Sequence, residues 1–419
     1  MEEIWRTLPQ DTREVLSSSK TECGSRSLLL ERFADPRWEG DKRKEHWKRV
    51  IEKSKPCMAE ERRMAWLDFV LSACGPDDLL FGRLRSRLMV NMAGGVMENA
   101  GLCLDRFGLP YIPGSAVKGC ARRAAIRELR DLQAAPAEKA AVLELIALVF
   151  GWTGDDWEKE NSDFCYGCGP ESPVIRQIAA QRLCEKLGIE PDPGKPCWRS
   201  LPNFAGRVRF LPAHPHDPAE PRLALEVVTS HHRDYYQGKR DAAFDDEDPN
   251  PVLFPAVAPG SVFLFALPPA PRGSKELQGK AKKWLRMGLE KEGIGAKTAA
   301  GYGWFDCSEE LQEQYRAKLE EDRREQERAK ARAGLEPDPA WLQCFSEEKE
   351  DRLRGRIKKF KEEEKHWSEA DRDERYQLSL FHFLTVVDTK IYKEEQAKAK
   401  SDVLKALKNL AQKFGRKLP

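Results

Sequence analysis

Apolar residues recur at helical spacing in the first 82 residues. Trp47 and Val50 lie three positions apart, and the segment 64–71 places methionine, tryptophan, phenylalanine, valine and leucine at intervals that suit a helix. Cys74-Gly75-Pro76 interrupts this pattern, because glycine and proline end helices. The pattern predicts an N-terminal helical region over residues 1–82.

Residues 83–307 have a different pattern, in which strand-like runs alternate with helical ones. Two segments have a helical period, Ser115–Arg130 and Lys275–Lys291. The strand candidates are Arg85–Asn91, Arg207–Leu211, Leu223–Val228, Ser261–Leu267 and Tyr302–Cys307. The order strand, helix, strands, helix, strand matches the split βαβ arrangement. We therefore expect an α+β fold, a ferredoxin-like (RRM-like) core with long irregular insertions at about 151–205 and 231–258.

Residues 308–419 are again helical in pattern. More than half of the residues in 308–334 are charged, with both signs mixed, which indicates a solvated helix or helical linker. Tyr376–Leu384 and Leu404–Phe414 carry apolar stripes. We expect a charged helical C-terminal extension that ends in a small bundle or in a helix that docks a partner.

Composition and charge limit how the protein could contact nucleic acid or a membrane. Of the 419 residues 33% are charged, above the roughly 25% of an ordinary soluble domain, yet the formal net charge is only +2. Contacts with nucleic acid would therefore need local basic patches. The N-terminal residues are polar and acidic, unlike a secretory leader, and no apolar run approaches the ~20 residues that span a bilayer. We expect a cytoplasmic protein with no membrane association and no cofactor.

The most informative segment is 293–303, which reads GIGAKTAAGYG. A backbone this rich in glycine can approach a ligand closely, and its amide groups can form an anion-binding concavity. Lys297 would add a positive charge and Tyr302 a face on which a base can stack. The glycines concerned are Gly293, Gly295, Gly301 and Gly303. A flexible surface turn is the alternative; a P-loop is not indicated, because alanine precedes the lysine and a helix precedes the loop.

A second basic segment is 108–123, which reads GLPYIPGSAVKGCARR. Its prolines lead into a helix start with Ser115 as the expected N-cap, and a helix start attracts anions. Lys118 and Arg122 are four positions apart and so share a helical face, which Arg123 extends. This arrangement suits a phosphodiester backbone. The alternative is a solvated basic helix face.

Taken together, these segments resemble a known family. PYIPGSAVKG followed far downstream by GIGAKTAAGYGWF is similar to the RAMP superfamily of CRISPR proteins, whose hallmark is a glycine-rich loop before the last strand. EVVTSHHRDYYQGK, DPNPVLFPAVAPGSVFLFAL and SRSLLLERFADP narrow the resemblance to the family of sixth subunits of type III-B (Cmr) effector complexes. The resemblance covers roughly residues 21–307, and it leaves the tail from 308 and much of 155–202 without a counterpart.

The resemblance implies a role in antiviral defence. Family members bind RNA near the 3′ end of the guide CRISPR RNA, cap a filament of backbone subunits and contact neighbouring subunits. The residue that cuts target RNA belongs to a different subunit. The resemblance therefore implies a non-catalytic RNA-binding subunit, with guide RNA and other effector subunits as partners and target RNA as a further candidate.

The segment His231-His232-Arg233-Asp234-Tyr235-Tyr236 allows two functional interpretations. A histidine could act as general base on a ribose hydroxyl, which would make the chain a metal-independent RNA endonuclease that processes guide RNA. Alternatively, His231, His232 and Tyr235 stack on bases while Arg233 holds a phosphate. The resemblance favours recognition over catalysis, and a plain structural loop is the third alternative.

Two further clusters have weaker patterns. Cys165 and Cys168 have the spacing of a zinc knuckle, but the later cysteines, Cys184 and Cys197, are not a short-spaced pair, so the sequence does not decide whether zinc binds. The acidic run Asp245–Asp248 is expected to be a solvated turn. We expect no metal site.

Overall fold

The computed structural model describes residues 9–11, 14, 26–31, 38, 40–53, 59–91, 102–216, 223–230, 232–243, 250–361, 367–398 and 400–419. The chain divides into two compact units, Met1–Glu313 and Gln314–Pro419, which are described separately below. Within the described ranges, none of the helices is both long and apolar enough to cross a membrane.

A four-stranded antiparallel sheet forms the centre of the first unit. Its strands stand in the order β4, β7, β1, β8, so β1 lies between β7 and β8. Leu79 of β1 pairs with Ala266 of β7. The strands are β1 (Leu79–Leu84), β4 (His214–Pro215), β7 (Val262–Ala266) and β8 (Phe305–Asp306). Helix α5 (Gly114–Asp131) lies on the path from β1 to β4, and α11 (Lys275–Lys291) connects β7 to β8.

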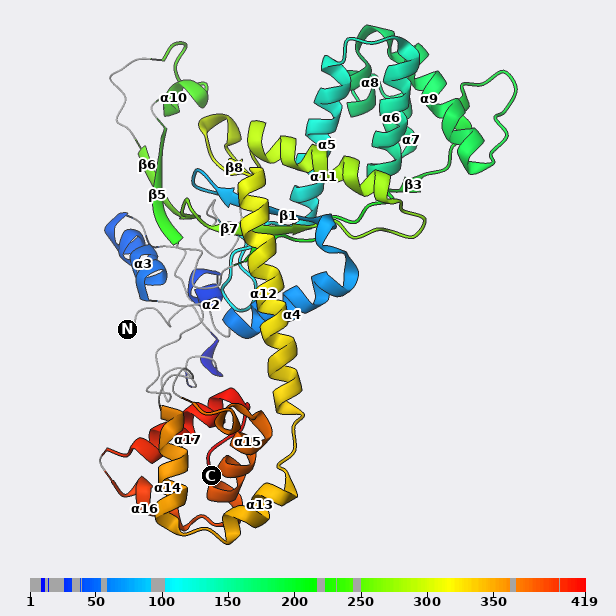
Figure 1. Cartoon of the computed structure of the whole chain (residues 1–419). Helices are drawn as coiled ribbons and strands as arrows, with labels where there is room; N and C mark the ends of the chain where they lie inside the picture. The colour runs from blue at the N-terminus through cyan, green and yellow to red at the C-terminus, as the bar shows by residue number, and fades with distance from the viewer. Residues whose placement is uncertain are drawn as a thin grey trace. The chain divides into compact units, whose positions relative to one another are not determined.

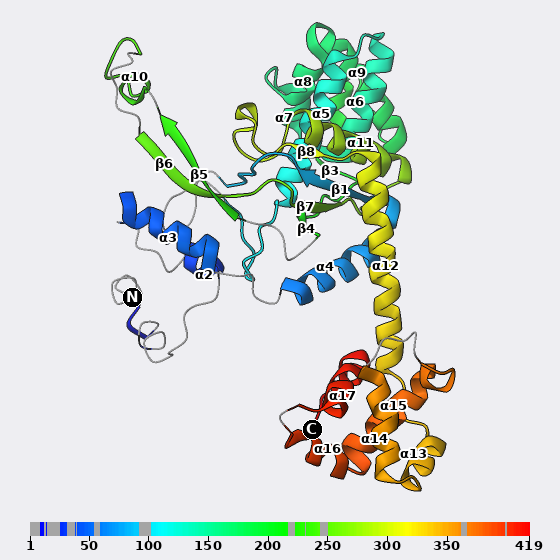
Figure 2. The ribbon, with the colours of Figure 1, turned by 60° about the vertical axis from the view of Figure 1, so that its left-hand side comes forward.

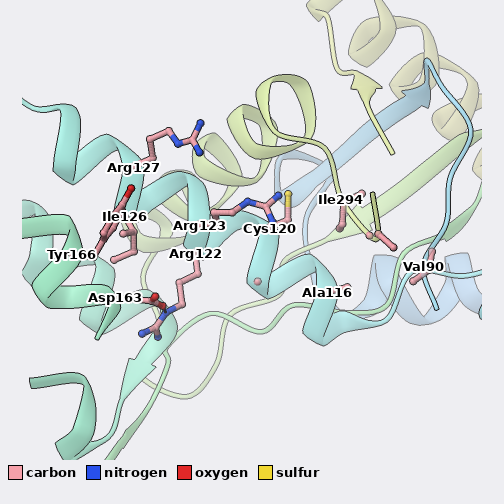
Figure 3. Close-up of a pocket in the computed structure, with 13 residues that line it drawn as sticks. Val90, Ala116, Cys120, Arg122, Arg123, Ile126, Arg127, Asp163, Tyr166 and Ile294 are labelled. Carbon is pink, nitrogen blue, oxygen red and sulfur yellow. Dashed lines mark hydrogen bonds and ion pairs between the residues drawn. The ribbon is translucent and has the colours of Figure 1, made fainter. Parts of the chain in front are cut away.

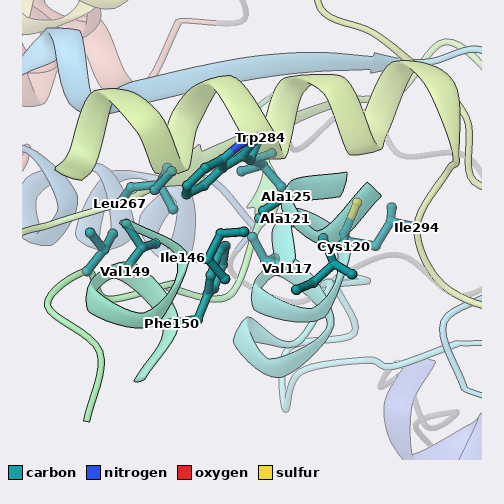
Figure 4. Close-up of a cluster of buried hydrophobic side chains, with 14 of the residues drawn as sticks. Val117, Cys120, Ala121, Ala125, Ile146, Val149, Phe150, Leu267, Trp284 and Ile294 are labelled. Carbon is teal, nitrogen blue, oxygen red and sulfur yellow. The ribbon is translucent and has the colours of Figure 1, made fainter. Parts of the chain in front are cut away.

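The two connecting helices pack tightly against each other (Figure 4). On α5 the apolar residues recur every three or four positions, at Val117, Ala121 and Ala125, and they bury this face against Trp284 of α11. The alanines are small, and α11 has Gly288 where a Cβ would lie 2.8 Å from the Sγ of Cys120. Small residues on both helices therefore allow the close contact that places α5 beside the end of α11.

The stretch expected to be an irregular insertion at 151–205 is largely helical, which corrects that prediction. It follows α6 (Pro136–Phe150) and contains β2 (Gly151–Trp152), α7 (Gly154–Glu158), α8 (Asp163–Cys168), α9 (Ser172–Leu187) and β3 (Phe204–Ala205). Ile175, Ala179 and Leu183 on α9 are buried in the same hydrophobic core as α6. These helices gather around α5 in both ribbon views (Figures 1 and 2).

A separate two-stranded hairpin forms another part of this unit. It consists of β5 (Leu223–Ser230) and β6 (Asn250–Val257), with the short helix α10 (Arg233–Tyr236) in the connection between them. Helix α3 (Gly40–Lys53) packs against both strands, and α2 (Arg26–Glu31) contacts α3. The expected strand at Leu223–Val228 is confirmed, but it pairs in this hairpin instead of the four-stranded sheet.

Several predicted boundaries were wrong. The first strand is β1, which precedes the expected Arg85–Asn91, and Arg207–Leu211 contains only an isolated bridge from Val208 to Pro269. Helix α5 begins at Gly114, and Pro113 stands at its N-cap in place of Ser115. A Cβ on Gly114 would lie 2.3 Å from the carbonyl oxygen of Phe210, so the helix start is packed directly against that backbone.

The region before β1 includes α4 (Ala59–Ala73), whose Trp66 ring lies 4.6 Å from the ring of His214 on β4. Helix α12 (Glu309–Ala333) begins beside β1. There Gln312 accepts a hydrogen bond from the backbone amide of Phe81 at 2.9 Å and donates one to its carbonyl at 2.7 Å. Strand β8 pairs only with Arg83 and Leu84 of β1. The side chain of Gln312 therefore supplies the hydrogen-bond partners for the backbone of Phe81, at the part of this strand edge that β8 does not reach.

The second unit is a set of helices around their own hydrophobic core. The boundary between the units falls within α12. Its described α-helices after α12 are α13 (Pro339–Ser346), α14 (Glu350–Lys358), α15 (Glu374–His382), α16 (Lys390–Gln396) and α17 (Asp402–Lys413). Asp338, Asp373 and Ser401 accept hydrogen bonds from first-turn amides and so cap α13, α15 and α17. Helices are thus present where the charged and striped patterns predicted them.

Candidate nucleic-acid interface

A cleft of about 700 Å³ separates the exposed side of α5 from the start of the glycine-rich loop (Figure 3). We call it the α5 cleft. Its lining combines one face of α5, the start of α8 and the backbone of 294–296, and comprises Val90, Ala116, Gly119, Cys120, Arg122, Arg123, Ile126, Arg127, Asp163, Tyr166, Ile294, Gly295 and Ala296. The two basic segments singled out in the sequence therefore lie side by side.

Arg123 joins the two walls of the α5 cleft. Its Nε lies 2.6 Å from a carboxylate oxygen of Glu292, and its Nη2 donates to the carbonyl of Gly293 at 2.6 Å. Arg127, one turn further along α5, approaches the same carboxylate only to 3.5 Å, and its side chain is 60% exposed. Glu292 is buried and shared by two guanidinium groups, so a positive charge remains available at this edge of the cleft.

Arg122 and Lys118 face the helical insertion. Arg122 pairs with Asp156 at 2.6 Å and with Asp163 at 2.8 Å. Partial burial, together with the charge of Arg122, lowers the pKa of Lys118, and Asp156 opposes this effect. The shared helical face predicted from the spacing exists, but much of its charge is used to hold α7 and α8 against α5.

The glycines of the loop serve close backbone packing. A Cβ on Gly295 would lie 2.1 Å from the carbonyl oxygen of Met89, and one on Gly303 would lie 1.9 Å from that of Ile294. Both residues, like Gly293 and Gly301, have positive φ. The amides of Ile294, Ala296 and Gly303 donate to backbone carbonyls at 2.8–2.9 Å. These amides are engaged within the fold, so the anion-binding concavity expected from bare amides is not formed by them.

Lys297 and Tyr302 differ in their accessibility. Lys297 is exposed, directly follows the lining residue Ala296 and adopts φ +54°. Tyr302 is half-buried; burial and a hydrogen bond with Glu226 of β5 raise its pKa, while Arg87 lowers it. Arg87 itself pairs with Glu226. Lys297 can therefore reach a ligand, whereas Tyr302 connects the loop to the hairpin.

The histidine and tyrosine segment lies away from the α5 cleft. His231 falls outside the described residues, His232 is half-buried, and the side chain of Arg233 is likewise not described. Tyr235 and Tyr236 are exposed on α10, with ring centroids 5.4 Å apart. Both ribbon views show α10 at one end of the hairpin, apart from α5 (Figures 1 and 2). The structure thus unites two of the three predicted RNA-contacting segments.

Tyr166 is a lining residue that the sequence analysis missed. It comes from α8, the residue is 56% exposed, and the Arg130 guanidinium lies 4.0 Å from its ring centroid. The sequence placed this tyrosine between two cysteines, and only the cysteine spacing attracted attention. Its position in the α5 cleft depends on the packing of α8 on α5, which no local pattern shows.

The cysteines nearby are held by protein contacts. Cys165 accepts a hydrogen bond from Ser172 at 3.2 Å, and burial raises the pKa of Cys168 to about 12. Cys184 and Cys197 adjoin each other through a 3.7 Å contact from the Cys184 thiol to the Cys197 carbonyl. Among the described residues no group of three or more potential metal ligands is found. The acidic run Asp245–Asp248 lies outside the described residues.

The sequence profile of the RAMP superfamily matches residues 90–306, which include α5, the insertion, the hairpin and the glycine loop. The chain therefore belongs to the RAMP superfamily.

Within curated proteins the chain is similar to the CRISPR system Cmr subunit Cmr6 of Pyrococcus furiosus, with 27% identity over 242 residues. This match covers 53% of the chain and 65% of that relative's length.

Two solved structures are also similar. One is a chain of the type III-B Cmr-beta complex bound to cognate target RNA, with 16% identity, a TM-score of 0.38, and coverage of 64% of this chain and 72% of that one. The other is Cmr6 from Pyrococcus furiosus, with 23% identity, a TM-score of 0.29, and coverage of 55% and 97%. At these TM-scores neither likeness bears on the placement of the site.

Proposed function

We propose that this protein is a non-catalytic RNA-binding subunit of a type III-B CRISPR effector complex, which holds and caps the 3′ region of the guide RNA, contacts neighbouring subunits and so serves antiviral defence. The observation that carries the proposal is the α5 cleft, where arginines of α5 line one wall and the other wall, residues 294–296, leads directly into the exposed Lys297. Membership of the RAMP superfamily and similarity to a Cmr6 subunit support the assignment to this kind of complex.

The proposal includes a ferredoxin-like core. The strand order β4, β7, β1, β8, with every pairing antiparallel, supports it. In a split βαβ arrangement two strands joined by a helix are separated by a third strand. Here β7 lies between β1 and β4, and β1 lies between β7 and β8. The helical insertion and the hairpin would then be additions to this core.

The mode of binding follows from the residues available. Arg123 and Arg127 line the α5 cleft, and the side chain of Arg127 is exposed. The exposed Lys297 directly follows the lining residue Ala296. Guanidinium and ammonium groups form strong, charge-assisted hydrogen bonds with phosphate oxygens. Such contacts position a strand without reading its bases. We therefore expect affinity for single-stranded RNA with little sequence preference and a strong dependence on salt.

The first test is a charge reversal at the loop. The Lys297→Glu variant should bind single-stranded RNA more weakly at low salt, whatever the sequence. The slope of log affinity against log salt should become shallower by about 0.7, the value for one phosphate contact with a single strand. Lys195→Glu is a matched control, because Lys195 is exposed in the loop after α9 and does not line the α5 cleft.

If Lys297→Glu binds RNA normally at several salt concentrations, the loop is not part of the RNA interface. Equal weakening by Lys195→Glu would show a general charge effect.

The non-catalytic part of the proposal has its own test. The full-length protein, incubated with repeat-containing RNA in the presence of a chelator, should leave the RNA intact, and His231→Ala and His232→Ala should behave identically. Specific cleavage that either substitution abolishes would instead establish a metal-independent endonuclease.

The identity of the RNA is tested by isolating the protein from its host and sequencing the RNA that accompanies it. We expect short RNAs that share a constant 5′ tag. A random sample of cellular RNA would contradict the assignment to a CRISPR complex.

A further inference from the structure

An exposed aromatic ring stands at one wall of the α5 cleft among basic side chains. Tyr166 is 56% exposed, and the other described residues of that wall include Arg122, Arg127 and Ile126. Figure 3 shows the tyrosine ring close to Ile126, with Arg127 and Arg122 on either side along α5. A single exposed aromatic ring is common on protein surfaces, so its role depends on what surrounds it.

The ring is held in place by several contacts. Arg130 donates to the backbone carbonyl of Tyr166 at 3.1 Å and lies over the ring at 4.0 Å from its centroid. Gly167, the next residue, packs so closely on α5 that a Cβ there would lie 3.0 Å from Leu129. Asp163, one turn earlier in α8, pairs with Arg122 of α5. These contacts hold the backbone around Tyr166 against α5, and Arg130 contacts the ring itself. Less freedom is then lost when a ligand binds.

The chemistry of the surroundings selects the occupant. A ring with a guanidinium over one side offers its remaining surface to a flat partner, and nucleobases stack on tyrosine irrespective of sequence. Arg123 and Arg127 supply positive charge for the connected phosphates.

We propose that Tyr166 is a stacking platform for one unpaired base of the RNA whose backbone lies along the α5 cleft. This inference rests on the proposed function and adds a base contact to it, from a helical insertion of the core. Arg130 acts as the positioning residue that holds the ring, and the contact confers a preference for an unstacked nucleotide at one place along the strand.

The test compares Tyr166→Ala and Tyr166→Phe in the full-length protein, with short single-stranded RNA oligonucleotides as probes. Tyr166→Ala should weaken binding about 10-fold, as the loss of one base–aromatic stack does, and Tyr166→Phe should restore most of the affinity. Phe69→Ala is the matched control, because Phe69 is 51% exposed on α4 and does not line the α5 cleft.

Abasic RNA distinguishes stacking from other roles. When abasic nucleotides are placed one at a time along the oligonucleotide, one position should weaken binding to the wild type, and at that position the wild type and Tyr166→Ala should bind equally. If Tyr166→Ala loses the same amount of affinity at every abasic position, or loses none, Tyr166 does not stack on a base.

Arg127→Ala separates the two proposals. If Arg127→Ala weakens RNA binding while Tyr166→Ala does not, the cleft binds RNA without this stack. If the wild-type protein binds no RNA, the proposed function fails and the platform fails with it.

Discussion

The loop glycines differ in what surrounds them, although the sequence presents them as one motif. Gly303 faces the carbonyl oxygen of Ile294, whereas a Cβ on Gly301 would meet no atom within 4 Å. Both have positive φ, at +70° and +91°. The glycine content predicted an unusual backbone correctly, but a sequence cannot distinguish a glycine that admits a ligand from one that admits another part of the backbone.

This difference predicts unequal effects on stability. Gly301→Ala should cost only the strain of a left-handed residue, about 1–2 kcal/mol. Gly303→Ala should cost more, because a Cβ 1.9 Å from a carbonyl oxygen forces the loop to move away from Ile294. Urea unfolding of both variants measures the free energies. Equal losses would show that the close approach at Gly303 is absent.

Cys120 lies in the wall of the α5 cleft and gives a pH-dependent prediction. Burial raises its pKa from 9.0 to about 12, with Glu292 adding to the effect and Arg123 opposing it. The native state thus favours the neutral thiol more than the unfolded state does. This contribution to stability is complete below pH 9.0 and is lost as the pH rises towards about 12, at up to about 1.4 kcal/mol per pH unit.

The wild type should therefore lose part of its stability advantage over Cys120→Ala as the pH rises above 9.0. Unfolding by urea across this range provides the measurement, and Cys344→Ala, at an exposed position, is the control. A constant difference between the wild type and Cys120→Ala would contradict the burial of this thiol.

At the scale of elements, amphipathic helices were predicted best. The segment Lys275–Lys291 is α11, because a half-buried helix shows its period in the sequence. Strand β1 was misplaced because most of its residues are buried, so it lacks the alternation that Arg85–Asn91 displays. Helices α7 and α8 are five and six residues long, too short for a helical period to appear.

The anchor between β1 and α12 predicts a large effect from one polar side chain. Gln312→Leu would leave the buried amide and carbonyl of Phe81 without the partners they have in Gln312. We expect a loss of about 2 kcal/mol or more in the free energy of unfolding, since each buried unsatisfied group costs about 1–3 kcal/mol. Gln181→Leu, on the exposed side of α9, should change stability little. Similar losses in the free energy of unfolding for the two variants would contradict the hydrogen bonds between Gln312 and Phe81.

At the scale of the whole molecule, the chain divides into two compact units. The α5 cleft lies entirely within Met1–Glu313, whereas Gln314–Pro419 has its own core around Tyr376, Leu380 and Leu407. The superfamily match at 90–306 covers only the first unit. The second unit lies outside the matched region and has its own core, so we expect it to carry the contacts with neighbouring subunits that the proposed function requires.

Deleting residues 334–419, which leaves α12 intact, should therefore preserve RNA affinity and reduce assembly with other effector subunits. Fluorescence anisotropy measures the first property, and co-purification from the host measures the second. Loss of RNA affinity with normal assembly would assign RNA binding to the second unit.

Photocrosslinking of the full-length protein to single-stranded RNA that contains 4-thiouridine, followed by mass spectrometry of the attached peptides, tests the central claim most directly. We expect crosslinks to 116–127, to Tyr166 and to 294–297, the walls of the α5 cleft and the lysine beside it. Crosslinks confined to α10 at the end of the hairpin, or to Gln314–Pro419, would contradict the account.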